Sequence, residues 1–398
     1  MNNRKVAYLF YWFFKIVFSL CGISIAGCNL APGFTNVYNT NQTWTFADGN
    51  SSIGINQSSQ YNAGNSRLIV FNSQLYAIWS ETNPGNIYQI RAALYNGNVS
   101  APSWPPLEVN GVAGINFNSL ENATAPGLNV FGGELYATWS ETNPSTISQI
   151  RVAYYNGSAL KPSWQPVDVN GTNVSGTNGI NYNSGFPAAT PQLMVFNGEL
   201  YATWSENNPS NLSQIRVAVY NGRDSAPFWT FVDVNGINGI NYNAGFNAYF
   251  PQLTVFNGEL YAIWSEYNGT ANQIRVAVYN GKDSAPLWTF VDGNGTNGIN
   301  QNSANNAVTP QMIGFNSTLF ATWSELNGTA NQIRFSKYNG NDSAPVWLLA
   351  DGGGTNGINF NSSFNATNPQ LTIFGGDLYA TWTEFNGTAN QIRVAFTN

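Results

Sequence analysis

One motif occurs six times in this chain, and the repetition limits the possible folds more than any other feature. Each copy places an acidic residue before a turn and a basic residue after it, as in "WSEYNGTANQIR" (Trp264 to Arg275). Successive copies begin 60, 65, 60, 59 and 59 residues apart, at Trp79, Trp139, Trp204, Trp264, Trp323 and Trp382. A repeat near 60 residues that contains several short apolar runs predicts the blades of a β-propeller rather than a helical solenoid.

One repeat predicts four strands. They are "PQLTVF" (251–256), "ELYAIWSE" (259–266), "QIRVAVY" (273–279) and "WTFVD" (288–292). Asn257-Gly258 separates the first two strands and is a strong signal for a two-residue hairpin turn, because both residues tolerate positive φ. The second strand is apolar on both faces, which is typical of a blade packed between two neighbours.

The two ends of the chain complement one another. The sixth repeat ends with "QIRVAF" and has no fourth strand, while "WTFADGNSSIGIN" (44–56) matches "WTFVDGNGTNGIN" (288–300) and precedes the first repeat. We therefore predict an all-β, six-bladed β-propeller of four-stranded blades over residues 44–398. Its ring is closed by the N-terminal strand pairing with the last blade, which removes an open sheet edge.

The repeat resembles that of kelch propellers. "VFGGELYATW" (130–139) has a double glycine, a Tyr and a Trp, and "VAVYNG" followed by Trp288 places a Tyr and a Trp in the third and fourth strands. The glycines here precede the second strand, and four of the six repeats lack the Gly-Gly pair. The architecture is also similar to that of symmetric lectin propellers, and neither likeness assigns a site residue.

Residues 1–27 are predicted to be a lipoprotein signal peptide. Arg4 and Lys5 precede an apolar run, and Ile25-Ala26-Gly27-Cys28 resembles the lipobox of bacterial lipoproteins. That resemblance implies cleavage before Cys28, a lipid with acyl chains such as palmitate on Cys28, and a polar tether over residues 28–43. The predicted location is the bacterial cell envelope, in the outer membrane or at the cell surface. The alternative is an uncleaved membrane helix over residues 6–26, which Lys15 disfavours.

Composition excludes several kinds of chemistry. The chain has no His, and its two Cys lie in the signal peptide and at its cleavage site, so Ser-His-Asp, thiol and imidazole–metal sites are not expected. A pair of carboxylates could still form a glycoside hydrolase, but Glu121 is the only acid on the predicted loop-rich face that does not recur from blade to blade. The prediction is that the chain is not an enzyme and has no catalytic residue.

The repeated acids and arginines are the candidate binding rim. Two connections open on one face of each blade. They are the turn between the second and third strands (the 2–3 turn) and the long connection from the fourth strand of one blade to the first strand of the next (the 4–1 connection or loop). The motif's Glu and Arg lie beside the 2–3 turn. The candidates are Glu81, Arg91, Glu141, Arg151, Glu206, Arg216, Glu266, Arg275, Glu325, Arg334, Glu384 and Arg393. The structural alternative is an ion pair between the Glu and the Arg that locks each hairpin. A further acid follows each fourth strand, at Asp48, Glu108, Asp168, Asp233, Asp292 and Asp351.

Aromatic residues supply a second candidate set. Twelve of the 13 Trp occupy two fixed positions per repeat and are expected to pack inside the fold. Aromatics that vary between the loops are better candidates for stacking on a sugar. These are Phe117, Tyr182, Tyr242, Tyr267 and Phe360.

The favoured function is a surface-anchored module that binds glycans. The alternative is a protein-interaction scaffold that uses the whole propeller face. Without Arg4, Lys5 and Lys15 the chain carries 11 basic and 20 acidic residues, so nucleic acid is not an expected partner. We expect a monomer with no cofactor. Calcium in "DGNGTNG" (292–298) is a minor possibility, because this stretch lacks two features of a calcium loop.

Overall fold

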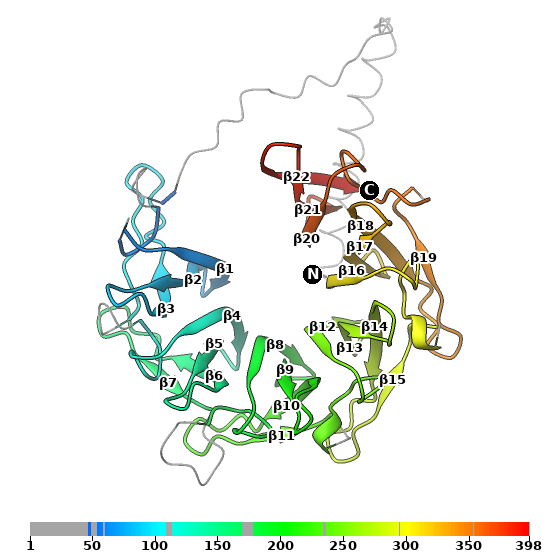
Figure 1. Ribbon diagram of the computed structural model, residues 1–398. Helices are drawn as coiled ribbons and strands as arrows, with labels where there is room; N and C mark the ends of the chain where they lie inside the picture. Colours follow the sequence, from blue (N-terminus) through cyan, green and yellow to red (C-terminus); the bar gives the residue numbers. More distant parts are fainter. Residues whose placement is uncertain are drawn as a thin grey trace, which may run out of the picture. The chain divides into compact units, whose positions relative to one another are not determined.

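The protein is all-β, with six blades arranged in a ring (Figure 1). The computed structural model describes residues 47–48, 54–58, 60–108, 114–168, 178–233, 236–293, 295–352 and 354–397. The strands of the first three blades are β1 (Ala63–Phe71), β2 (Gln74–Thr82), β3 (Tyr88–Leu94); β4 (Ala123–Phe131), β5 (Glu134–Thr142), β6 (Ser148–Tyr155), β7 (Trp164–Pro166); β8 (Ala188–Phe196), β9 (Glu199–Asn207), β10 (Ser213–Tyr220) and β11 (Trp229–Phe231). Those of the last three are β12 (Ala248–Phe256), β13 (Glu259–Tyr267), β14 (Asn272–Tyr279), β15 (Trp288–Phe290); β16 (Ala307–Phe315), β17 (Thr318–Leu326), β18 (Asn331–Tyr338), β19 (Trp347–Leu349); β20 (Ala366–Phe374), β21 (Asp377–Phe385) and β22 (Asn390–Thr397). This confirms the predicted propeller.

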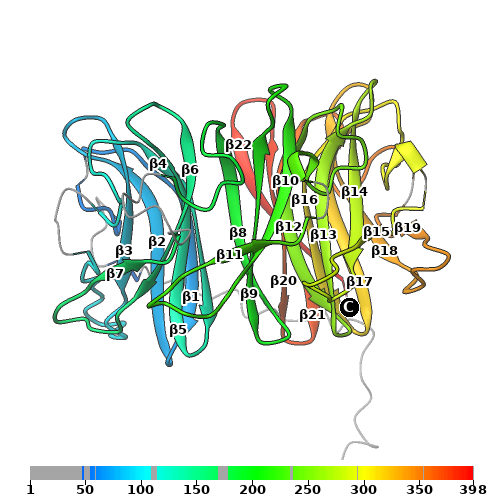
Figure 2. The same ribbon diagram turned by 90° about the horizontal axis from the view of Figure 1, so that it is seen from below.

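Each blade is an antiparallel meander from the ring's centre outward. In the fourth blade β12 pairs with β13, β13 with β14 and β14 with the short outer strand β15. Asn257 and Gly258 have φ values of 50° and 79°, which confirms the predicted two-residue turn. Two short 3₁₀ segments, η2 (Gly236–Asn238) and η3 (Gly295–Asn297), follow outer strands. Seen from the side, the strands run between the two faces of the ring (Figure 2).

The core lies between neighbouring blades. Leu253 of β12 belongs to one buried cluster with Val217 of the preceding blade, and Trp264 is in the same cluster. All six second-strand Trp are buried, as expected from their regular spacing. Apolar side chains buried between neighbouring blades therefore hold these blades together.

Every first strand contains a β-bulge near its start. In β12 the register shifts between Tyr249 and Gln252, and Phe250 has a φ of 56°. The equivalent residues of the other blades also have positive φ, namely Asn65, Ala125, Thr190, Thr309 and Asn368. The observed β12 begins three residues before the predicted strand because the bulge lets pairing continue past Pro251.

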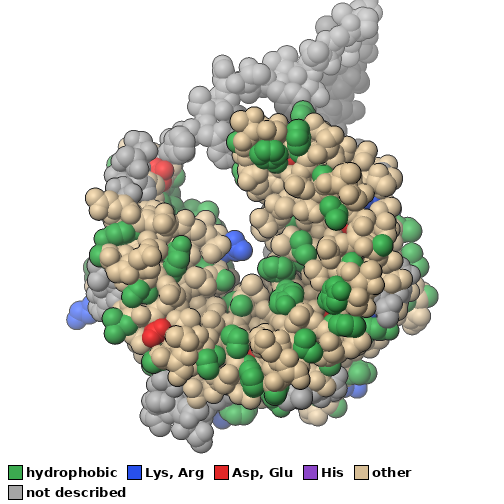
Figure 3. Space-filling model, viewed as in Figure 1, with side chains coloured by type: hydrophobic (Ala, Val, Ile, Leu, Met, Phe, Trp, Pro, Cys, Tyr) green, Lys and Arg blue, Asp and Glu red, His purple; other side chains and the backbone are tan. Residues whose placement is uncertain are grey.

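The first and sixth blades have three strands each among the described residues. Figure 3 shows an opening in the ring between them, in the region of β1 and β22. The predicted closing strand begins at Trp44, and residues 44–46 lie outside the described part. So do the predicted signal peptide (1–27) and tether (28–43). Within the described residues no helix is long and apolar enough to cross a membrane.

Candidate functional site

The motif's glutamate fixes the long loop that enters each blade. Glu266 accepts hydrogen bonds from the backbone N–H groups of Tyr242 (2.9 Å) and Asn243 (2.7 Å) and from the indole N–H of Trp264 (2.8 Å). Trp264 and Glu266 are two residues apart on one strand, so their side chains share a face. The same three kinds of donor bind the other five glutamates, Glu81, Glu141, Glu206, Glu325 and Glu384.

These bonds place the 4–1 loops and the 2–3 turns on one face, as predicted, and we call it the loop face. All six glutamates are buried, with exposed fractions of 0–3%. Burial raises the pKa of Glu266, while the hydrogen bonds from Trp264, Asn243 and Tyr242 lower it. Each carboxylate is therefore an anchor for loop backbone.

The motif's arginine pairs with the acid that follows the fourth strand. Arg275 Nε lies 2.9 Å from Asp292 Oδ2, and both side chains are buried. The equivalent pairs are Arg91–Glu108, Arg151–Asp168, Arg216–Asp233 and Arg334–Asp351, at 2.8–3.3 Å. In these five blades the arginine therefore forms its ion pair with the fourth-strand acid, while the motif's glutamate binds the loop amides and acts on Arg275 as a nearby charge. The β13–β14 register places Arg275 opposite Trp264 rather than opposite Glu266.

Burial also dominates the ionisation of the fourth-strand acids. It raises the pKa of Glu108 to about 7, and those of Asp233 and Asp292 each to about 6. In each case the neighbouring arginine lowers the pKa, by less than burial raises it.

Four of the five loop aromatics are supported by these arginines. The guanidinium carbon of Arg275 lies 4.1 Å from the centre of the Tyr242 ring. Phe117 on Arg151, Tyr182 on Arg216 and Phe360 on Arg393 have the same arrangement, at 4.2–4.3 Å. All four rings are 39–76% exposed, and we call them the aromatic platforms. The first and fifth blades have Gln57 and Gln301 at this position.

Tyr267 is held differently. Its ring contacts Phe246 edge-on at 5.6 Å, and its hydroxyl donates to the carbonyl of Gly269 at 2.9 Å. It lies in the 2–3 turn of the fourth blade and is 37% exposed. The structure therefore brings the predicted aromatics to one face, with four on arginines and one on a neighbouring loop.

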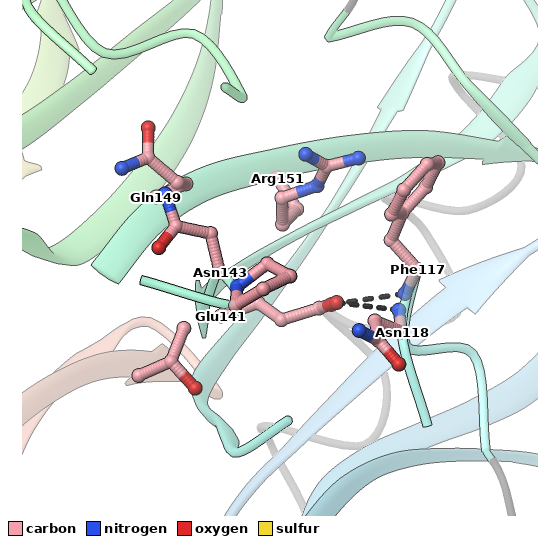
Figure 4. A pocket seen from close by; sticks show the side chains of 8 residues that line it. Phe117, Asn118, Glu141, Asn143, Gln149 and Arg151 are labelled. Carbon is pink, nitrogen blue, oxygen red and sulfur yellow. Dashed lines mark hydrogen bonds between the residues drawn. The ribbon is translucent and has the colours of Figure 1, made fainter. Parts of the chain in front are cut away.

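Small pockets lie beside two platforms. In the second blade a cavity of about 40 Å³ is lined by Phe117, Glu141, Asn143, Gln149 and Arg151. Figure 4 shows the Glu141 carboxylate directed at the loop amides and Arg151 beside the Phe117 ring. The equivalent cavity next to Tyr242 has about 20 Å³. Such volumes hold only a few water molecules, so a sugar ring would lie over the platforms rather than inside a pocket.

Sequence reasoning missed a set of interactions on the opposite face. At the interface between the second and third blades, Asp224 accepts hydrogen bonds from the hydroxyls of Tyr136 (3.0 Å) and Tyr220 (2.7 Å), and Glu134 lies beside it. Two similar clusters form around Asp283 and Asp342. The signal was present in the sequence, because each Asp follows a third-strand Tyr by four residues.

Among the described residues, no group of three or more His, Cys, Asp or Glu side chains is placed to hold a metal ion. The predicted calcium stretch (292–298) includes Asn294, which lies outside the described residues. Calcium there stays a prediction.

No family model matches the chain, and no curated protein matches it. Solved structures do. One is a Dyadobacter fermentans protein described as of unknown function, with 12% identity, 84% of this chain and 94% of that chain covered, and a TM-score of 0.48. Another is the endo-arabinase from Bacteroides thetaiotaomicron, with 12% identity, 69% and 93% covered, and a TM-score of 0.38. A third is the sialidase of Trypanosoma rangeli, with 11% identity, 84% and 54% covered, and a TM-score of 0.47.

These likenesses correct one prediction. Several similar structures are described as glycoside hydrolases or sialidases, and this finding contradicts the prediction that the chain is not an enzyme. At 9–12% identity the likenesses show the fold alone and identify no catalytic residue here.

Proposed function

We propose that the protein recognises glycans on the loop face of its propeller. The observation that carries the proposal is the set of aromatic platforms, Phe117, Tyr182, Tyr242 and Phe360. Each ring is packed on a guanidinium on one side and remains partly open to solvent. A rigid, partly exposed aromatic ring can stack on the apolar face of a sugar at little cost in side-chain entropy.

The charge distribution favours neutral glycans. The motif's glutamates are buried and hydrogen-bonded to loop backbone, and five of its arginines are paired with buried acids. The loop surface around Tyr242 is supplied by uncharged residues such as Asn243 and Asn268. Amide groups of this kind donate to and accept from sugar hydroxyls.

Recognition through the platforms is multivalent. Their positions are equivalent in four blades, so a branched or polymeric glycan would reach several of them. Each contact is weak, about 1 kcal/mol for an aromatic stacking interaction, and linkage between contacts raises the overall affinity.

We also propose that the protein works at the cell envelope, anchored by a lipid on Cys28. The lipobox-like tetrad and the apolar run before it support this location. We also propose that the repeats are related to those of kelch and lectin propellers, on the basis of the sequence likeness described above. Incorporation of labelled palmitate into the wild-type chain and its loss in Cys28→Ser would support the anchor, and equal labelling of both would refute it.

The test is a glycan array probed with the full chain in detergent, followed by calorimetry on each hit. Wild type should bind neutral glycans with several equivalent sites. Tyr242→Ala should reduce the number of sites and Tyr242→Phe should retain them, because the ring rather than the hydroxyl does the stacking. Replacing all four platforms with Ala should remove binding while the circular dichroism spectrum stays unchanged.

Other outcomes separate other functions. Release of reducing sugar from a bound glycan would show that the same face is catalytic. Binding that survives loss of all four platforms would refute the proposed site. Absence of any glycan ligand, together with one asymmetric protein footprint on the loop face, would favour the scaffold alternative.

A further inference from the structure

The first strand of the fourth blade differs from those of the other five blades at its bulge. Tyr249 and Phe250 lie there with their ring centres 6.3 Å apart, and their side chains are 39% and 41% exposed. The equivalent pairs of the other blades contain no aromatic residue, and they are Gly64-Asn65, Thr124-Ala125, Ala189-Thr190, Val308-Thr309 and Thr367-Asn368. Five blades form without an aromatic pair at this point, so the fold does not require one.

Phe250 also strains the backbone. Its φ is 56°, and positive φ is unfavourable for a bulky side chain. Asn65 and Asn368 hold the same position in the first and sixth blades, and asparagine tolerates this conformation better. The Phe250 ring is not buried in the core, so packing does not explain why a strained aromatic residue stands here. Backbone strain of this kind is concentrated at binding and catalytic sites.

Both residues lie where the loop face meets the axis of the ring. β12 is the innermost strand of its blade, and the 4–1 loop on the loop face leads into its first residues. Figure 3 shows a hollow at the centre of the ring, with hydrophobic side chains along part of its edge. Tyr249 and Phe250 are therefore at the loop-face end of this central hollow.

Tyr267 lies between this pair and the Tyr242 platform. The backbone N–H of Tyr267 donates to the Asn247 carbonyl at 2.9 Å, and Tyr249 is opposite Ser265 in the β12–β13 register. The side chains of Tyr267 and Tyr249 therefore project from the same face of the sheet, at the diagonal spacing over which aromatic side chains can interact. On its other side Tyr267 lines the small cavity next to Tyr242.

We call Tyr242, Tyr267, Tyr249 and Phe250 the aromatic track. All four side chains are 37–43% exposed, and they lead from a platform to the axis of the ring. The blades that carry the other three platforms have no aromatic residue at the bulge. Their aromatic side chains therefore end before the axis, and the fourth blade alone continues to it.

We propose that the aromatic track binds one linear oligosaccharide of uncharged sugars, with one sugar ring on Tyr242 and the following sugars directed toward the axis. This inference rests on the proposed glycan function and adds a preference for longer chains in the fourth blade. Aromatic rings in series offer stacking surfaces to successive sugar rings. Glu266 and Arg275 line the cavity beside Tyr242. Both are already bound, the first by loop amides and the second by Asp292, so an uncharged chain fits this surface best.

A length series tests the proposal on the full chain in detergent. Phe117→Ala, Tyr182→Ala and Phe360→Ala together leave Tyr242 as the one platform. The probe is the neutral glycan that binds wild type on the array, supplied as linear oligomers of increasing length and titrated by calorimetry. The affinity of this parent variant should rise with oligomer length. Adding Tyr249→Thr and Phe250→Asn should weaken the long oligomers roughly tenfold and leave the shortest binding oligomer unchanged, because only long chains reach the axis.

Matched variants control for indirect effects. Val308→Thr with Thr309→Asn makes the equivalent change in the fifth blade and should leave every affinity unchanged. A variant that keeps Tyr182 as its one platform should gain nothing from longer oligomers, because the third blade has no aromatic residue at its bulge. Tyr249→Thr with Phe250→Asn should melt no lower than the parent, since asparagine relieves the strained φ.

The possible failures are distinguishable. If the parent with Tyr249→Thr and Phe250→Asn still binds longer oligomers more tightly, or if the Tyr182 variant does so equally, the track is not the site and only the platforms remain. If wild type binds no glycan of any length, both this inference and the proposed function are overturned.

Discussion

The guanidinium carbon of Arg275 lies 4.1 Å from the centre of the Tyr242 ring, so a buried cation supports an aromatic side chain that is 43% exposed. The same guanidinium is paired with Asp292. One arginine thus joins the third strand and the end of the fourth strand to the incoming loop. Because a planar guanidinium can stack and pair at once and an ammonium group cannot, lysine is a poor substitute at this position.

Arg275→Lys should therefore lower the free energy of unfolding by about 1–2 kcal/mol. It should also weaken any ligand that binds the Tyr242 platform. Urea unfolding followed by circular dichroism measures the first effect and calorimetry the second. Arg67→Lys is the control, since the only hydrogen bond of Arg67 in the described structure is to the adjacent Ser66 carbonyl. Equal stability of wild type and Arg275→Lys would mean that the stacking contributes nothing.

Glu266 is the loop anchor, and its amide analogue tests that role. Glu266→Gln keeps the shape but turns one acceptor oxygen into a donor, which would face the N–H groups of Tyr242 or Asn243. Leaving a buried donor without an acceptor costs roughly 1–3 kcal/mol, and we expect a loss of stability of that size. Hydrogen exchange of the Tyr242 and Asn243 amides should accelerate in the variant.

Asp377→Asn makes the same acid-to-amide change at the turn between β20 and β21 and should have little effect. If both variants lose stability equally, the three hydrogen bonds that Glu266 accepts do not anchor the loop.

The buried fourth-strand acids predict an unusual pH dependence. Burial raises the pKa of Glu108 from an ordinary value near 4.5 to about 7, so the folded state holds this proton more tightly than the unfolded state does. The resulting stabilisation is complete below the unfolded pKa and is lost as the pH rises through about 7. Asp233 and Asp292, each at about 6, add to the loss at lower pH.

The melting temperature should therefore fall between pH 5 and pH 8 at constant ionic strength. Glu108→Gln should remove the part of this slope that lies nearest pH 7, because the amide does not titrate. A melting temperature that rises over this range, with the same slope in Glu108→Gln, would contradict the assignment.

The positions of the strands and turns could be predicted from sequence because they depend on neighbouring residues. Alternating apolar residues, the Asn257-Gly258 turn and a fixed repeat length each report on neighbours within a few residues. The partner of Arg275 could not be found in that way, since the nearest acid in sequence, Glu266, is already bound by loop amides. The actual partner Asp292 reaches the arginine only through the pairing of β14 with β15.

The contacts of the aromatic platforms could not be predicted from local sequence either. Sequence variation between loops identified Tyr242 as a candidate for stacking and placed it on the loop face. It gave no sign that the ring rests on Arg275, because that contact depends on the path of the 4–1 loop after Glu266 has fixed it. A contact between a loop and a strand depends on how the loop is fixed in the folded structure, and the spacing of residues along the sequence does not predict it.

The bulge in each first strand offers a final test, at Thr309. This residue has a φ of 52°, which is costly for a β-branched side chain, and its buried hydroxyl has no hydrogen-bond partner. Asn65 and Asn368 hold the same position in other blades with φ values of 57° and 53°, and asparagine tolerates this conformation best among residues with a side chain. Thr309→Asn should therefore raise the free energy of unfolding by about 1 kcal/mol. Thr318→Asn, at the ordinary start of β17, should bring no gain, so equal stabilisation by both variants would show that relief of backbone strain is not the cause.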